Sequence, residues 1–251
     1  MQKYFIKSSS LSGSIKTPPS KSETMRSLLF AALGRGKSVV RNYLASPDTT
    51  HMANACRSFG ASVTFTTATQ VEIIGVAGNI KSLPPLIFAG NSGLILRFSS
   101  AVAALGSDAV TLTGDASLQM RPMKELIYSL VQLGAKVVTK NRSGFAPLTI
   151  QGPIKPGKIK ISGEDSQPVS ALLIASSLVK GPVEIEVDNA GEKPWVALTL
   201  SWFDRLNIPY QNKNFSNYRT FGPSSFNGFS YEIPGDISTA AFAIGAALIT
   251  N

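Results

Sequence analysis

The sequence has very little of the residues that many enzymes use to bind metals or attack substrates. Its 251 residues include one cysteine, Cys56, and one histidine, His51. A single cysteine excludes an internal disulfide, and the two residues together are too few for a zinc finger or another Cys/His metal cluster. A Ser-His-Asp triad would have to use His51, which lies in a segment that reads as a surface helix. Any catalysis is therefore expected to depend on Lys, Arg, Ser, Gln, Asp and Glu.

Long apolar runs are missing as well. No run reaches the ~18 residues that a membrane helix needs, and residues 1–16 lack the apolar core of a secretory signal. With the single cysteine, these absences predict a cytoplasmic protein without a membrane partner. The 21 glycines and 15 prolines are scattered and 43% of the residues are apolar, which excludes collagen, coiled coils and bulk disorder.

Acidic residues are outnumbered by basic ones, 15 against 24, so the net charge is +9. A basic protein suits an anionic partner such as nucleic acid, an anionic membrane or a phosphorylated metabolite. The basic residues are dispersed, however, and the densest patch is the short stretch 155–160. Nucleic-acid binding is therefore an alternative that the pattern does not favour, and an ordinary basic surface is another.

A unit of about 70 residues repeats along the chain. Each copy of its first helix opens with a small polar residue and continues rich in Ala and Leu; the four copies are residues 22–36, 91–106, 166–181 and 235–250. Equivalent leucines at 33, 105, 178 and 248 are separated by steps of 72, 73 and 70 residues. These helices are apolar nearly all round, which is typical of buried helices.

A helix end followed by a hairpin recurs in the same phase. Its copies are residues 56–75, residues 127–152 and, more weakly, residues 200–222. The predicted unit is thus strand, helix, strand, helix, hairpin, and such alternation implies an α/β fold with mixed sheets. Three units make one domain, and the fourth contains only its first helix, which suggests a truncated chain.

The first motif with a chemical meaning is PPSKSETMR at 18–26. Ser20 and Glu23 have the spacing of a capping box, which predicts a helix start. Lys21, Ser22 and Arg26 then lie at a helix N-terminus, whose free N–H groups attract anions. The alternative is an ordinary capped helix with solvated charges.

Three further motifs resemble the first in position or in residue type. In AGNSGLILR, Asn91 and Gly93 lie at a turn into a helix on which Arg97 follows. In LTGDASLQMRPM, Arg121 and a following proline are predicted to open a helix, where a cation opposes the helix dipole and therefore suggests an anionic ligand. In ISGEDSQPVSALL, Asp165 or Ser166 caps a helix and the Gln167 amide is free to bind a ligand. All but the Arg121 loop share one phase of the repeat, which predicts a common basic cup for phosphates.

These motifs, together with SPDTTHMANACRSFGA and PGDISTAA, resemble the EPSP synthase (3-phosphoshikimate 1-carboxyvinyltransferase) family in order and spacing over the whole chain. The resemblance implies a transferase of the shikimate pathway, in chorismate and aromatic amino-acid biosynthesis. It would move the enolpyruvyl group of phosphoenolpyruvate to the 5-hydroxyl of 3-phosphoshikimate and release phosphate, without a metal or organic cofactor. The implied fold is an α/β fold of EPT-like βαβαββ repeats, three per domain in an inside-out α/β barrel. A monomer is expected.

The resemblance also implies a domain division. Residues 1–20 would supply first strands to a partly missing domain, 21–230 would form the complete three-unit domain, and 231–251 would begin the second domain. The family's general acid/base residues lie in that second domain, so the chain alone is expected to be incomplete. A separately encoded C-terminal half is the expected partner, and a non-catalytic remnant or anion-binding half-domain is the alternative.

The resemblance assigns roles to matched positions. Lys21 would contact both substrates and is the nearest candidate for a catalytic residue, with Asp236 a weak second. The residues implied to bind 3-phosphoshikimate are Lys21, Ser22, Arg26, Ser166 and Gln167. Those implied to bind phosphoenolpyruvate are Lys21, Asn91, Gly93, Arg121 and Gln167, with Arg97 in support.

Several positions depart from the family pattern. Asp165 and Glu192 stand where serines usually bind the substrate phosphate, and carboxylates there would repel a phosphate unless they are protonated, paired or turned away. Trp195 replaces a tyrosine that packs on the shikimate ring. The sister enzyme UDP-N-acetylglucosamine enolpyruvyltransferase is a weaker alternative, because Ala116 stands where that enzyme has a reactive cysteine.

Overall fold

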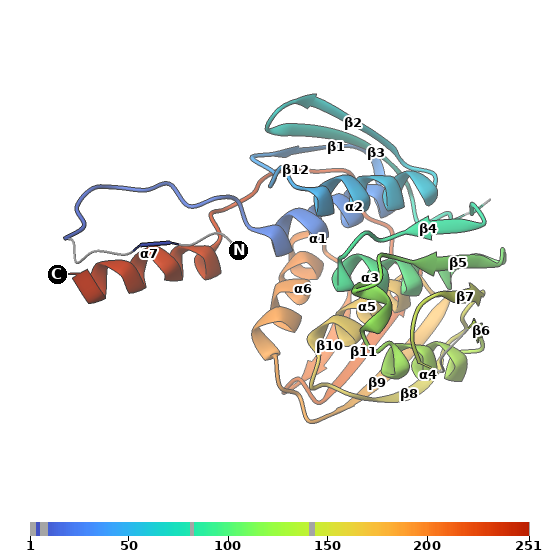
Figure 1. Ribbon diagram of the computed structural model, residues 1–251. Coiled ribbons are helices and arrows are strands. Elements are labelled where there is room, and N and C mark those ends of the chain that lie inside the picture. The colour runs from blue at the N-terminus through green and yellow to red at the C-terminus, as the bar shows by residue number, and fades with distance from the viewer. Residues whose placement is uncertain (1–3, 6–9, 81–82, 141–143, 251) are drawn as a thin grey trace.

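Three four-stranded sheets form the outside of the molecule, and the helices that precede and follow their strands lie between them (Figure 1). The computed structural model describes residues 4–5, 10–80, 83–140 and 144–250. Strands show alternating burial, with one face against the helices and the other toward solvent, as in the pattern of Gly181–Asp188. The predicted α/β class is therefore observed, with strands on the outside and helices between the sheets (Figure 1).

The elements follow the predicted repeat. The first unit contains α1 (Lys21–Leu33), β1 (Arg35–Arg41), α2 (Pro47–Ser58), β2 (Ser62–Thr67) and β3 (Gln70–Val76). The second contains β4 (Leu86–Phe88), α3 (Gly93–Ala103), β5 (Val110–Thr113), the single turn η1 (Leu118–Met120), α4 (Lys124–Gln132), β6 (Lys136–Thr139) and β7 (Leu148–Gln151). The third contains β8 (Gly157–Ser162), α5 (Ser166–Ser176), β9 (Gly181–Asp188), α6 (Lys193–Arg205), β10 (Tyr210–Lys213) and β11 (Asn217–Gly222). The last two elements are β12 (Ser230–Glu232) and α7 (Ile237–Thr250).

The three sheets have the same topology. The strand orders are β4-β5-β7-β6, β8-β9-β11-β10 and β12-β1-β3-β2. In each sheet the first two strands are parallel. The third strand is antiparallel to the second, and the fourth is antiparallel to the third. The first strand of the first sheet is β12, which pairs with β1 from Val39↔Ser230 onward. The sheet of the first unit is thus completed by a strand that follows the third unit in the chain.

Helices α1, α3 and α5 form the centre of the molecule. The residues of each are buried over almost their whole length, and helix α3 packs against α5. Their alanines and serines present little side-chain volume, which allows neighbouring helices to approach closely. The prediction of buried helices is confirmed for these three copies.

The three helices that precede the hairpins end in the same way; they are α2, α4 and α6. Gly60, Gly134 and Asn207 follow them with φ of 98°, 95° and 53°. This left-handed conformation ends a helix, and glycine and asparagine adopt it most easily. The third unit thus has asparagine where the other two have glycine.

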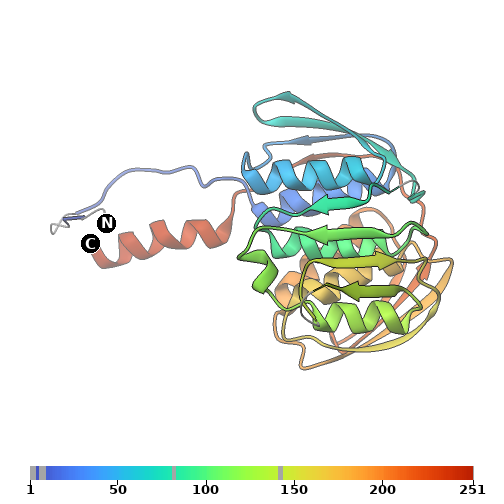
Figure 2. The ribbon, with the colours of Figure 1, turned by 45° about the vertical axis from the view of Figure 1, so that its right-hand side comes forward.

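The segment 10–18 and helix α7 project together from the body of the molecule (Figures 1 and 2). They cross where Ser20 N donates to Pro234 O and Asp236 N donates to Pro18 O, both at 2.8 Å. Helix α7 has no buried residue, so the prediction that 235–250 is a buried helix is wrong for this structure. The reason is that the chain leaves the body at this crossing, and no described segment covers the helix.

The predicted domain limits fall close to this crossing. Strand β12 spans the expected limit at 230 and 231. Within the described part of residues 1–20, the predicted strands are represented by one bridge between Pro19 and Gly235; residues 1–3 and 6–9 lie outside the described residues. No helix of the described chain is long and apolar enough to cross a membrane.

Candidate functional site

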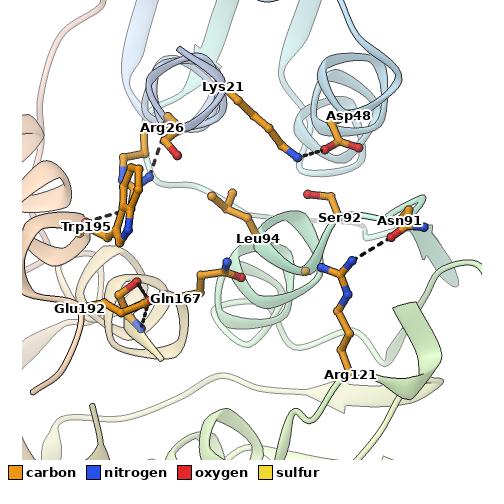
Figure 3. Close-up of a pocket in the computed structure, with 13 residues that line it drawn as sticks. Lys21, Arg26, Asp48, Asn91, Ser92, Leu94, Arg121, Gln167, Glu192 and Trp195 are labelled. Carbon is orange, nitrogen blue, oxygen red and sulfur yellow. Dashed lines mark hydrogen bonds and ion pairs between the residues drawn. The ribbon is translucent and has the colours of Figure 1, made fainter. Parts of the chain in front are cut away.

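A cavity of about 520 Å³ lies where the N-terminal ends of the central helices meet (Figure 3). Its lining residues come from all three units: Lys21, Ser22, Arg26, Asp48, Asn91, Ser92, Gly93, Leu94, Arg121, Ser166, Gln167, Glu192 and Trp195. The sequence predicted this convergence from the shared phase of the motifs. Of the predicted site residues, Arg97, Asp165 and Asp236 are not part of this lining.

Polar side chains cap the helices that point into the cavity. The Ser20 hydroxyl accepts from Glu23 N at 3.4 Å, and the Asp165 carboxylate accepts from Gln167 N at 2.9 Å. The capping box predicted for Ser20 and Glu23 is only half formed. The Glu23 carboxylate accepts instead from Trp202 Nε1 at 2.8 Å, which ties α1 to α6.

Arg26 is the most deeply buried cation at the cavity, with 2% of its surface exposed. Its guanidinium donates to Thr199 Oγ1 at 2.9 Å and to the carbonyl oxygens of Ser22 and Trp195 at 3.3 and 3.1 Å. Burial lowers its pKa to about 10, and the nearby charge of Glu23 opposes that shift. All three acceptors are neutral, so the charge at neutral pH favours an anion in the cavity.

Lys21 lies at the N-terminus of α1, on the side opposite to Arg26 (Figure 3). Its ammonium forms an ion pair with Asp48, from the first turn of α2. The Lys21 side chain is half exposed and the Asp48 side chain is 19% exposed, so the pair faces the cavity (Figure 3). An anionic ligand would compete with Asp48 for this ammonium.

Arg121 is positioned by a chain of hydrogen bonds rather than by a helix. It donates to Asn91 Oδ1 at 2.9 Å, and the Asn91 amide donates to Asp115 at 2.9 Å. The sequence prediction that Arg121 opens a helix is wrong: η1 ends one residue before it, and α4 starts three residues after it. An extended backbone at Arg121 directs its side chain toward the cavity, so its position no longer implies a conflict with a helix dipole.

Arg97 fixes the orientation of Gln167. The Arg97 side chain is 7% exposed; it donates to Gln167 Oε1 at 2.8 Å and to Pro122 O at 3.1 Å, and it pairs with Asp165 at 2.9 Å. Burial lowers its pKa, while the charge of Asp165 opposes that change. An arginine can only donate, so Gln167 must present its amide N–H groups to the cavity.

The two unusual carboxylates both have partners. Asp165 pairs with Arg97, and Glu192 accepts from Ser166 N at 3.1 Å and from Ser166 Oγ at 2.7 Å. The repulsion expected between these carboxylates and a phosphate is thus reduced for Asp165 by pairing. Glu192, in contrast, reaches the cavity and occupies the end of α5.

Gly93 lies where three functional side chains meet. A Cβ at this position would lie 2.7 Å from Arg97 Nη1, 3.1 Å from Arg121 Nη1 and 3.4 Å from Gln167 Oε1. Any larger residue must therefore displace these groups. The glycine at the start of α3 keeps this floor of the cavity open.

Asp236 does not join the site. Its carboxylate accepts from Thr239 N at 2.9 Å and so caps α7, outside the cavity. Trp195 lies at the cavity edge beside Arg26, with 39% of its surface exposed (Figure 3). Among the described residues, no three His, Cys, Asp or Glu side chains lie close enough together to bind a metal.

Sequence reasoning missed two acidic residues that position the basic ones. Asp48 holds Lys21, and Asp115 holds Asn91 through its amide. The signal for Asp48 was its place just after Ser46 and Pro47 at the start of a helix, because this puts a fourth helix end near the other three. Asp115 lies in the motif LTGDASLQMRPM, in which the sequence indicated only Arg121 as a candidate site residue.

Comparison with known proteins decides the family. The sequence profile of EPSP synthase (3-phosphoshikimate 1-carboxyvinyltransferase) matches residues 6–251. The chain belongs to the EPSP synthase family. It is 41% identical to the 3-phosphoshikimate 1-carboxyvinyltransferase of Chlamydia caviae over 251 residues, which cover all of this chain and 56% of that protein. The corresponding Chlamydia pneumoniae protein is 39% identical and is also covered to 56%.

Solved structures agree with this membership of the EPSP synthase family. The structure of EPSP synthase from Acinetobacter baumannii superposes with a TM-score of 0.82 at 25% identity. The superposition covers 93% of this chain and 52% of that one. The chain therefore spans about half the length of the EPSP synthases that it matches.

Proposed function

We propose that this chain forms one wall of an enolpyruvyl-transfer site. The reaction would move the enolpyruvyl group of phosphoenolpyruvate to the 5-hydroxyl of 3-phosphoshikimate and release phosphate. Both substrates are anionic phosphorylated metabolites, which suits a basic, water-accessible cup and a cytoplasmic location. The observation that carries the proposal is Arg26, a buried guanidinium with neutral hydrogen-bond partners at the floor of that cup.

The proposed roles of the basic residues follow from their positions. Lys21 and Arg26 lie on α1 and would hold the phosphorylated shikimate together with Ser22. Arg121, held by Asn91, would bind an anionic group of phosphoenolpyruvate next to Gly93. Charge-assisted hydrogen bonds of this kind are stronger than neutral ones and give geometric selectivity.

The remaining polar residues would orient the two substrates relative to each other. Gln167 presents N–H groups between the α1 side and the Arg121 side of the cavity, and Arg97 supports it. Holding two reactants in register removes much of the entropic cost of their encounter. Trp195 would pack against the apolar face of the ring.

We propose that turnover needs a second part of about the size of this chain. The relatives are about twice as long as this chain. The residues of this chain line one side of a cavity that is open to solvent. That part is either a continuation of the chain or a separately encoded C-terminal half. The exposed apolar side chains of α7, among them Phe242 and Leu248, are where it would attach.

Turnover measured as phosphate release tests both statements. The chain would be assayed with phosphoenolpyruvate and 3-phosphoshikimate, alone and mixed with the separately expressed C-terminal portion of the Chlamydia caviae relative. We expect release only in the mixture, and Arg26→Ala should abolish it. Rapid release by the chain alone would contradict the need for a second part, and none in a mixture that forms a stable complex would contradict the activity.

A second candidate function is anion binding without catalysis. The carboxylates of Asp48 and Glu192 inside the cavity support it, since they weaken the site for highly charged substrates. Calorimetry with 3-phosphoshikimate distinguishes the two functions. Tight binding that Lys21→Ala abolishes, together with no turnover in any mixture, would favour this candidate.

A further inference from the structure

One of the helix ends in the cavity is already occupied by a group of the protein. The Glu192 carboxylate accepts two hydrogen bonds from Ser166, one from the backbone N–H and one from the hydroxyl. These donors belong to the first residue of α5, where free N–H groups and the helix dipole attract an anion. Glu192 therefore takes the place at α5 that an anionic ligand group would take.

The other helix ends differ from α5. The first turns of α1 and α3 are capped by the neutral hydroxyls of Ser20 and Ser92, at long distances of 3.4 and 3.5 Å. Within the described chain, no carboxylate accepts from a backbone N–H in the first turn of either helix, although Asp48 pairs with the Lys21 ammonium. The cavity thus has an anion-accepting side, formed by α1, α3 and Arg121, and a side closed to anions at α5.

The position of Glu192 shows that its carboxylate is committed to α5. It is the N-cap residue of α6, yet its side chain makes no capping hydrogen bond to that helix. It lies on an exposed stretch between β9 and α6, so water and ligands reach it. Its neighbour Asp165 is neutralised by Arg97, whereas the contacts of Glu192 at α5 are to neutral groups.

We propose that Glu192 is an internal competitor for this anion position and sets which groups of a ligand enter the α5 side of the cavity. A carboxylate and a phosphate cannot share the two Ser166 donors, and their like charges repel at this distance. A ligand phosphate must displace Glu192 or bind elsewhere, while a ligand hydroxyl can donate to Glu192. The identity of the natural ligand rests on the proposed function, but the competition itself does not.

The experiment uses inorganic phosphate as the probe. Its dissociation constant would be measured by calorimetry at fixed pH and ionic strength for the unmodified chain, Glu192→Ser, Glu192→Gln and Glu164→Gln. Glu164 is exposed and lies two residues before Ser166, so its variant removes one charge nearby without vacating the position. Melting temperatures of the four proteins check that each is folded.

We expect Glu192→Ser to bind phosphate about tenfold more tightly, a change of ~1.4 kcal/mol. Glu192→Gln should fall between that variant and the unmodified chain, because its amide oxygen still accepts from Ser166. Glu164→Gln should change the affinity less than about twofold, as expected for a screened surface charge. Equal gains in Glu192→Ser and Glu164→Gln, or no gain in either, would overturn the proposal.

A second measurement locates the bound phosphate and separates this proposal from the proposed function. In Glu192→Ser, phosphate should shift the amide resonance of Ser166 at concentrations that leave it unshifted in the unmodified chain. An unshifted Ser166 in the variant would overturn the proposal. Turnover of the two proposed substrates in the mixture with the C-terminal portion is scored independently, so either idea can fail while the other stands.

Discussion

At the scale of single residues, the cavity depends on side chains that hold other side chains. Asp48, Asn91 and Arg97 each position a group that faces the ligand space. Such supporting contacts matter because a displacement of about 1 Å at a binding group can cost a large factor in rate.

Arg97→Lys should loosen Gln167. A lysine cannot bond Gln167, Asp165 and the Pro122 carbonyl at once, because it lacks the planar fork of arginine. We expect ~1–3 kcal/mol lower stability, the cost of unmet buried hydrogen bonds, and about tenfold weaker ligand binding, equivalent to ~1.4 kcal/mol. Urea unfolding and calorimetry would measure these. The exposed Arg219→Lys is the control, and equal effects in both variants would argue against a positioning role.

Gly93→Ala should narrow the cavity without unfolding the protein. The new methyl group would press on Arg97 and Arg121, while alanine itself favours the helix by up to ~1 kcal/mol. We expect weaker binding of phosphoenolpyruvate and a melting temperature within a few degrees of the unmodified chain. Gly245→Ala in α7 is the matched control, since nothing lies within 4 Å of its new Cβ. Unchanged affinity in Gly93→Ala would contradict the placement of that ligand next to Arg121.

At the scale of elements, most boundaries follow from local chemistry. Serine or aspartate caps, a proline near a helix start and left-handed residues after a helix were visible in the sequence and are observed. The exceptions involve tertiary contacts. The Glu23 carboxylate accepts a hydrogen bond from Trp202 instead of completing the capping box. Arg121 follows η1 in an extended conformation and donates to Asn91, so it lies in a loop and not in a helix.

Ser20→Ala should destabilise α1, and with it the central helix layer. The long 3.4 Å cap bond places the expected loss at the low end of the usual range, about 0.5–1 kcal/mol. Ser20→Asp, which keeps a side-chain acceptor and adds a charge favourable to the helix dipole, should restore the stability. Urea unfolding of the two variants gives the comparison. A loss of the same size in Ser20→Asp would show that the hydroxyl is needed for something other than capping.

At the scale of the whole molecule, burial of weak acids predicts alkaline unfolding. Burial raises the pKa of the Cys56 thiol from 9.0 to about 12 and that of the Tyr231 phenol from 10.0 to about 12. The folded state therefore retains protons that the unfolded state loses. The stability gained in this way is complete below pH 9 and is lost as the pH rises from 9 to 12.

We expect the urea midpoint to fall steadily over that pH range. Cys56→Ala should make the fall shallower from pH 9 upward, and Tyr231→Phe should do so from pH 10 upward. The replacement of the exposed Tyr128 by Phe serves as the control for removing a phenol. A fall with the same slope in Cys56→Ala and the unmodified chain would rule out the thiol as a contributor.

The sequence by itself determined the repeat, the α/β class, the buried central helices and many of the residues at the cavity, but it missed Asp48 and included Asp236, which lies outside. These features depend on local patterns. Apolar faces, caps and turn residues recur because each unit contains the same helices and strands in the same order. It also indicated that Asp165 and Glu192 are unusual, but not what they contact.

Only the tertiary structure decided which groups pair. The Arg97–Asp165 and Lys21–Asp48 ion pairs, and the bond from Ser166 to Glu192, join residues that are 26 to 68 positions apart or lie on different helices. It also decided that β12 completes the first sheet and that α7 lies outside the core. Side-chain pairing and strand closure depend on distances between units, and those distances are set by how the three sheets pack around the helices.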